Sequence, residues 1–89
     1  MKKTKVYLIG AGPGDPQLLT LKAIHAIENS RAILYDQLVN KEVLSHVKPG
    51  THLVYVGKKK GAHVIPQDEI NRLLVELASQ YDVVARLKG

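Results

Sequence analysis

Short apolar runs alternate along this chain with longer segments in which apolar residues recur every three or four positions. The runs at 6–9 and 32–35 are unbroken and of strand length, which indicates buried parallel strands. Two further runs, at 53–56 and at 83–85 with Leu87, indicate a third and a fourth strand.

Three segments between these runs have the spacing of amphipathic helices. The first has Thr20 as a candidate N-cap and ends at Asn29–Ser30. The second follows a candidate cap at Asn40 and stops at Pro49–Gly50, and the third has Pro66 at its first helical position. Their apolar faces are Leu18, Leu21, Ala23, Ile24 and Ile27; Val43, Leu44 and Val47; and Ile70, Leu73, Leu74 and Leu77.

The resulting β-α-β-α-β-α-β order predicts an α/β fold in a single domain, residues 1–89, with helices on the faces of a parallel β-sheet. Parallel strands all end at one edge of their sheet. We therefore expect Gly10–Asp15, Asp36, Lys58–His63 and Arg86–Gly89 to converge there. In so short a chain, an exposed fourth strand or an uncovered sheet face would promote association.

The composition is that of an ordinary globular protein, with 45% hydrophobic and 24% charged residues. No apolar run approaches the roughly 20 residues of a membrane span, and no signal-peptide core follows the first lysines. We therefore expect a cytoplasmic protein without a membrane partner. The lack of cysteine and the four scattered histidines predict no metal site, and the net charge of +5 favours acidic partners.

A glycine-rich turn follows the first strand. Gly10, Gly12 and Gly14 alternate, and the third glycine of a dinucleotide-binding fingerprint would fall where Asp15 stands. No Gly-Lys-Ser/Thr follows, so the turn is not a P-loop either. Its small residues would let another molecule approach the backbone closely. The alternative is a plain strand-to-helix connection, with Asp15 as a cap and Pro16 at the first helical position.

The string Gly-Ala-Gly-Pro-Gly-Asp-Pro at 10–16 closely resembles the opening of the tetrapyrrole methylase family. Within that family the chain is most similar to the enzymes that methylate uroporphyrinogen III. The further matching strings follow in the family's order, at 18–23, 35–39, 56–63, 66–71 and 86–89. Members of the family continue well beyond this point. The resemblance therefore implies the amino-terminal part of such an enzyme, with little or no activity alone.

The resemblance implies an activity: S-adenosylmethionine-dependent transfer of two methyl groups to ring carbons of uroporphyrinogen III. The product would be precorrin-2, on the route to sirohaem and cobalamin. The cofactor would lie in a cleft between two domains, and most of its contacts would come from segments after residue 89. In this chain Pro13, with Gly12 and Gly14, would contribute to cofactor binding. The parent enzyme is expected to be a homodimer.

The same resemblance assigns catalytic roles to Asp36 as general base and Lys58 as proton donor or electrostatic stabiliser. Without the resemblance, the residues favour a helix or turn cap for Asp36 and a solvated loop for the three lysines from Lys58. Gln37 replaces an arginine that is usual in the family, which removes a cation that would face the substrate.

Lys59, His63 and Gln67 also match the family's pattern and are predicted to support substrate binding. Lys59 stands where arginine is usual, so it keeps the charge but lacks the bidentate fork. Two alternatives stay open: a methylase of a later corrin precursor, or a non-catalytic module that binds polyanions. The scattered tyrosines form no stacking platform, and we expect no nucleic-acid partner.

Overall fold

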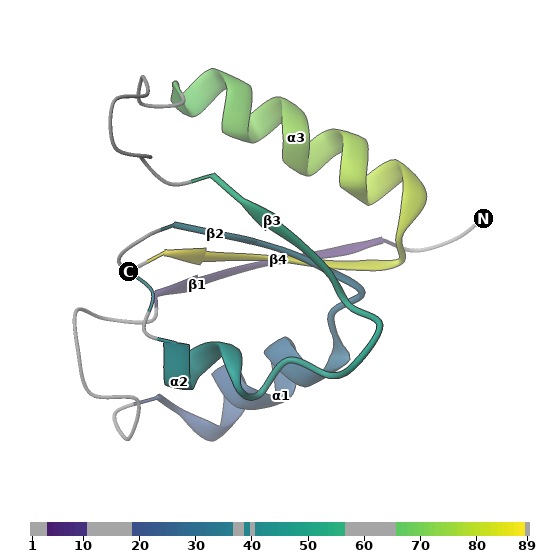
Figure 1. The fold of residues 1–89 in the computed structure, drawn as a ribbon. Helices are drawn as coiled ribbons and strands as arrows, with labels where there is room; N and C mark the ends of the chain where they lie inside the picture. The colour runs from purple at the N-terminus through teal and green to yellow at the C-terminus, as the bar shows by residue number, and fades with distance from the viewer. Residues whose placement is uncertain (1–3, 11–18, 37–38, 40, 57–65, 89) are drawn as a thin grey trace.

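The computed structural model describes residues 4–10, 19–36, 39, 41–56 and 66–88. Strands and helices alternate in it as the apolar pattern predicts (Figure 1). The elements are β1 (Lys5–Gly10), α1 (Leu21–Asn29), β2 (Ala32–Tyr35), α2 (Lys41–Leu44), β3 (His52–Tyr55), α3 (Gln67–Gln80) and β4 (Val83–Lys88). None of the helices in these ranges is long and apolar enough to cross a membrane.

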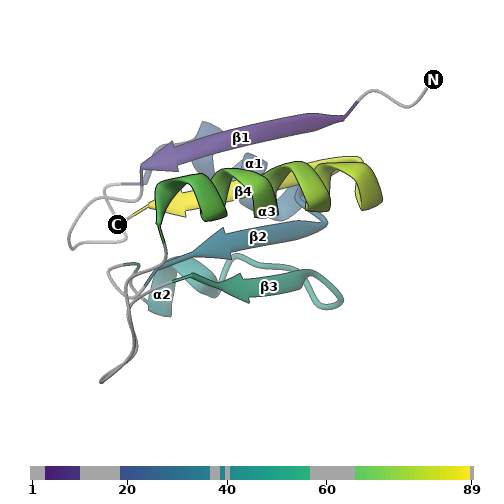
Figure 2. The same ribbon diagram turned by 90° about the horizontal axis from the view of Figure 1, so that it is seen from above.

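The four strands form one parallel sheet in the order β1-β4-β2-β3. Helices α1 and α2 lie on one face of the sheet and α3 lies on the other, as Figures 1 and 2 show from two directions. The last strand, β4, is inserted between β1 and β2. The expectation of an exposed fourth strand is therefore wrong, and the edges of the sheet are β1 and β3.

Two apolar layers hold the helices to the sheet, one on each face. Along β2, Ile33 packs toward α1 and α2 whereas Leu34 packs toward α3, because successive residues of a strand point to opposite faces. The first layer includes Ile9, Ile27, Val43 and Leu87, and the second includes Ile70, Leu77 and Val84. The predicted apolar faces are confirmed for Ala23 and Ile27 of α1, Val43 and Leu44 of α2, and the four residues predicted on α3. The prediction is wrong for Leu21, which is 75% exposed at the first position of α1, and Val47 packs against the same layer from beyond the end of α2.

The helix boundaries follow local capping. The Thr20 side chain accepts a hydrogen bond from the Ala23 N–H (3.1 Å), so α1 begins at Leu21; Asp15, Pro16 and Asn40 lie outside the described residues. Pro66 has extended backbone angles (φ −61°, ψ 150°) and is the N-cap of α3. The prediction that Pro66 is the first helical residue is wrong by one position.

Strand β1 is less buried than its apolar sequence predicts. Within the described part of the chain it pairs with β4 alone, and α3 leaves its outer residues uncovered, so Val6 is 46% and Leu8 is 76% exposed. On the opposite face, Tyr7 and Ile9 pack against the layer formed with α1. The prediction of a fully buried first strand is wrong, because an apolar run does not reveal whether a strand lies in the middle or at the edge of its sheet.

An unpaired strand edge flanked by exposed apolar side chains should cause the 89-residue chain to self-associate. We expect Leu8→Lys to weaken this association about tenfold, measured by sedimentation velocity over a concentration series, and to leave the melting temperature unchanged. Val75→Lys is the matched control, because Val75 is 70% exposed but lies on α3, away from any strand edge. Equal effects of the two substitutions would contradict an association through β1.

Candidate active site at the carboxyl edge of the sheet

The carboxyl ends of all four strands lie level with one another. Gly10 is the register partner of Lys88, and Tyr35 is the partner of both Leu87 and Tyr55. This register confirms the predicted convergence for the described residues Gly10, Asp36 and Lys88, and Val56 lies at the same edge (Figure 1). A ligand at this edge would meet residues from four separate parts of the sequence.

Asp36 directly follows β2 and is half-buried. The Tyr35 carbonyl accepts a hydrogen bond from the Val56 N–H (2.8 Å), which extends the pairing of β2 with β3 beyond both strands. The Asp36 carbonyl accepts one from the N–H of Val39 (3.2 Å), whose side chain is anchored in the apolar layer under α1 and α2. The backbone of Asp36 is thus fixed on both sides at the edge of the sheet.

Most of the other predicted site residues lie outside the described residues, and their roles stay predictions. These are the catalytic Lys58, the cofactor residues Gly12, Pro13 and Gly14, and the substrate residues Lys59 and His63. In the sequence, Lys58 comes two residues after Val56, which lies beside Asp36 at the carboxyl edge.

Gln67 is the first residue of α3. Helix α3 crosses back over the sheet, so its amino-terminal end lies at the same edge as the strand ends (Figure 1). The exposed Gln67 side chain donates a hydrogen bond from Nε2 to the Asn71 Oδ1 (3.0 Å). A substrate would therefore have to compete with Asn71 for this amide.

Arg86 on the central strand β4 is a cation that sequence reasoning grouped with this edge without giving it a role. Its register partners are Leu8 on one side and Leu34 on the other. Arg86 is half-buried, and its Nη1 donates to the Leu87 carbonyl (3.0 Å), so the side chain runs toward the carboxyl edge. None of the ion pairs among the described residues includes Arg86. The signal that could have assigned Arg86 a role is a cation between two apolar residues, Ala85 and Leu87, of a predicted strand.

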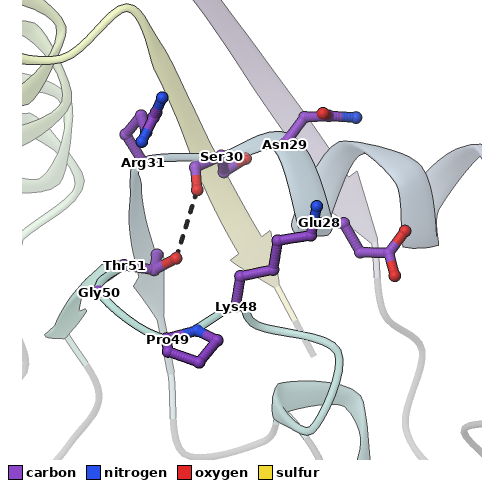
Figure 3. A pocket seen from close by; sticks show the side chains of 8 residues that line it. All are labelled: Glu28, Asn29, Ser30, Arg31, Lys48, Pro49, Gly50 and Thr51. Carbon is purple, nitrogen blue, oxygen red and sulfur yellow. Dashed lines mark hydrogen bonds between the residues drawn. The ribbon is translucent and has the colours of Figure 1, made fainter.

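Among the pockets that the described residues form, two lie at opposite ends of the sheet. A cavity of about 240 Å³ at the carboxyl end is lined by residues 7–10 of β1 and by Thr20, Lys22, Ala23 and Ala26 at the start of α1. A polar pocket of about 290 Å³ at the amino end is formed by the turns at 28–31 and 48–51 (Figure 3). Only the first adjoins the predicted site, since its wall ends at Gly10, where the glycine-rich turn begins.

Residues 5–89 match the family described as Tetrapyrrole (Corrin/Porphyrin) Methylases, and the chain belongs to that family. It is 51% identical over 85 residues to the uroporphyrinogen-III C-methyltransferase of Methanocaldococcus jannaschii, covering 96% of this chain and 35% of that protein. It is 58% identical over 85 residues to siroheme synthase 2 of Aeromonas hydrophila, covering 96% of this chain and 18% of that protein. The chain thus spans about a third or less of the length of these relatives.

Solved structures agree with this assignment. The uroporphyrin-III C-methyl transferase of Thermus thermophilus, complexed with S-adenyl homocysteine, superposes with a TM-score of 0.73 at 47% identity, over 96% of this chain and 32% of that one. The cobalamin biosynthetic enzyme cobalt precorrin-4 methyltransferase superposes with a TM-score of 0.72 at 29% identity, over 94% of this chain and 34% of that one. The parallel sheet with helices on both faces is therefore the family's fold, of which this chain forms part.

Arg86 should lower the free energy of unfolding. It is a half-buried cation between two leucines and has no carboxylate partner among the described residues. We expect Arg86→Leu to raise the free energy of unfolding by about 1 kcal/mol, measured by urea denaturation. Arg72→Leu is the control, since Arg72 is exposed and paired with Glu69. A destabilised Arg86→Leu variant would show instead that the guanidinium stabilises the sheet.

Proposed function

We propose that this chain is the amino-terminal part of an S-adenosylmethionine-dependent methyltransferase that converts uroporphyrinogen III to precorrin-2. The family match and the two named relatives support the reaction class and the substrate. The main structural support for the proposal is that the strands end at the same level, which places Asp36 beside the end of β3. The chain forms a single amino-terminal domain, and the rest of the site comes from segments beyond it.

When bound, S-adenosylmethionine supplies an electrophilic methyl group. The cavity beside Gly10 has room for part of the cofactor, and Gly12, Pro13 and Gly14 follow its wall in sequence. The chain's own task is to place a pyrrole carbon in line with that methyl and to move protons on the ring. Asp36 accepts the ring proton, and Lys58 donates one or stabilises the charge that develops.

The cations of the carboxyl edge suit a substrate with eight carboxylates. Arg86 and Lys88 lie two residues apart on β4, so both belong to the same face of the sheet. Lys59, His63 and Gln67 add donors from two further segments. These groups hold the acidic side chains of the macrocycle while Asp36 reaches the ring.

The proposal extends to the parent protein. We propose that the parent protein is a cytoplasmic homodimer, and that its product is a precursor of both cobalamin and sirohaem. The similarity to cobalt precorrin-4 methyltransferase favours a second candidate, a methylase of a later corrin precursor. The higher identity to the uroporphyrin-III enzyme, 47% against 29%, supports the earlier substrate.

A chimera tests the proposed reaction, with residues 1–89 replacing the matching segment of the Thermus thermophilus enzyme. We expect this chimera to convert uroporphyrinogen III to precorrin-2 in a mass-spectrometric assay, and we expect the 89-residue chain alone to be inactive. A folded chimera that binds S-adenosylhomocysteine but methylates no tetrapyrrole would overturn the proposal. Methylation by the isolated chain would overturn its assignment as a partial enzyme.

Asp36→Asn should lower the kcat of the chimera by roughly 10²- to 10⁴-fold, because the amide cannot accept the ring proton. Binding of S-adenosylhomocysteine, measured by calorimetry, should not change. Asp82→Asn is the matched control, because Asp82 pairs with Arg31 at the opposite, amino-terminal end of the sheet. An Asp36→Asn variant with the kcat of the unmodified chimera would remove Asp36 from the mechanism.

A further inference from the structure

Two tyrosines are in contact at the carboxyl edge. Tyr35 and Tyr55 are the last residues of β2 and β3 and are register partners. Their ring centroids lie 5.3 Å apart at an interplanar angle of 59°, within the range of favourable aromatic pairs. Both rings are partly buried, and that of Tyr35 also packs against the apolar layer under α1 and α2.

This contact joins the two strand ends that lead into the predicted catalytic groups. Asp36 directly follows Tyr35, and Val56 directly follows Tyr55. The Val56 N–H also donates to the Tyr35 carbonyl, so a backbone hydrogen bond and a ring contact act at the same register position. The separation between Asp36 and Val56 thus depends on this place in the sheet, together with the packing of the Val56 side chain in the apolar layer under α3.

Strand β3 needs such an anchor because it is short and lies at the edge of the sheet. It spans four residues, of which His52 and Leu53 are exposed. Its other end is held by a second aromatic contact, in which His52 Nδ1 and the Tyr81 hydroxyl are hydrogen bonded (3.0 Å) and the rings meet edge to face at 5.9 Å. The two contacts are alike in kind, but only the first adjoins Asp36.

We propose that Tyr35 and Tyr55 are a positioning pair, which fixes the end of β3 relative to Asp36 and so sets the geometry of proton transfer. This inference rests on the proposed function. The ring and not the hydroxyl is the active feature, because the contact between the two side chains is one of ring against ring. Phenylalanine at position 55 should therefore preserve kcat, whereas an aliphatic residue should lower it.

The chimera described above provides the kinetic test. Tyr55→Val introduces another residue that is common in strands and removes the ring; we expect kcat per folded molecule to fall roughly tenfold with KM changed less than twofold. Tyr55→Phe should retain kcat within about twofold. Tyr81→Val is the matched control at the other end of β3 and should leave kcat unchanged. An unchanged kcat in Tyr55→Val, or an equal loss in Tyr81→Val, would overturn the proposal.

Amide hydrogen exchange on the 89-residue chain separates this inference from the proposed function. Tyr55→Val should speed exchange of the Val56 amide at least about tenfold, and Tyr81→Val should instead speed exchange of the His52 amide, which donates to the Arg31 carbonyl. If the unmodified chimera is inactive, the exchange rate of the Val56 amide alone tests whether the tyrosine pair fixes the end of β3. Loss of protection at Val56 supports the positioning pair, and an unchanged Val56 amide in Tyr55→Val overturns it.

Discussion

The pairing of β4 with both β1 and β2 is the interaction on which the rest of this structure depends. Strand β4 lies between β1 and β2 and is paired with both. Its register aligns Gly10, Tyr35 and Lys88 at the carboxyl edge of the sheet. Without β4, the pair β2–β3 would have no link to β1. Because all three pairings are parallel, every strand that enters this sheet delivers its carboxyl end to the same side.

The same topology separates stability from function in space. The apolar layers on the two faces are built from side chains in the middle of the strands, such as Ile33, Leu34 and Val84, which are fully buried. The described polar candidates Asp36 and Gln67 lie where β2 ends and where α3 begins, at the carboxyl edge of the sheet. Arg86 is the exception, because it carries a charge into the face of the central strand. A charged residue at an otherwise apolar position is expected where the side chain binds a ligand and does not contribute to packing.

Much of this fold can be predicted from the sequence. The strand at 32–35 is predicted to the residue, because it is apolar throughout and is bounded by polar turns. The start of α1 follows from Thr20, whose side chain caps the helix through a local hydrogen bond.

The order of the strands cannot be predicted in this way, because it depends on contacts between distant segments. The exposure of β1 follows from that order, which is why the apolar run at 6–9 was misleading. The tyrosine pair was missed for the same reason, since Tyr35 and Tyr55 are scattered in sequence and meet only through the register of β2 and β3.

The proposed function requires that a tetrapyrrole binds where the strands end. Titrating the ¹⁵N-labelled chain with uroporphyrin III, the stable oxidised form of the macrocycle, while recording amide chemical shifts tests this claim most directly. We expect the amide shifts of Gly10, Asp36, Val56 and Lys88 to change in a saturable manner. Changes confined to the opposite end of the sheet, at Arg31, Lys48 and Thr51 around the polar pocket, would contradict it.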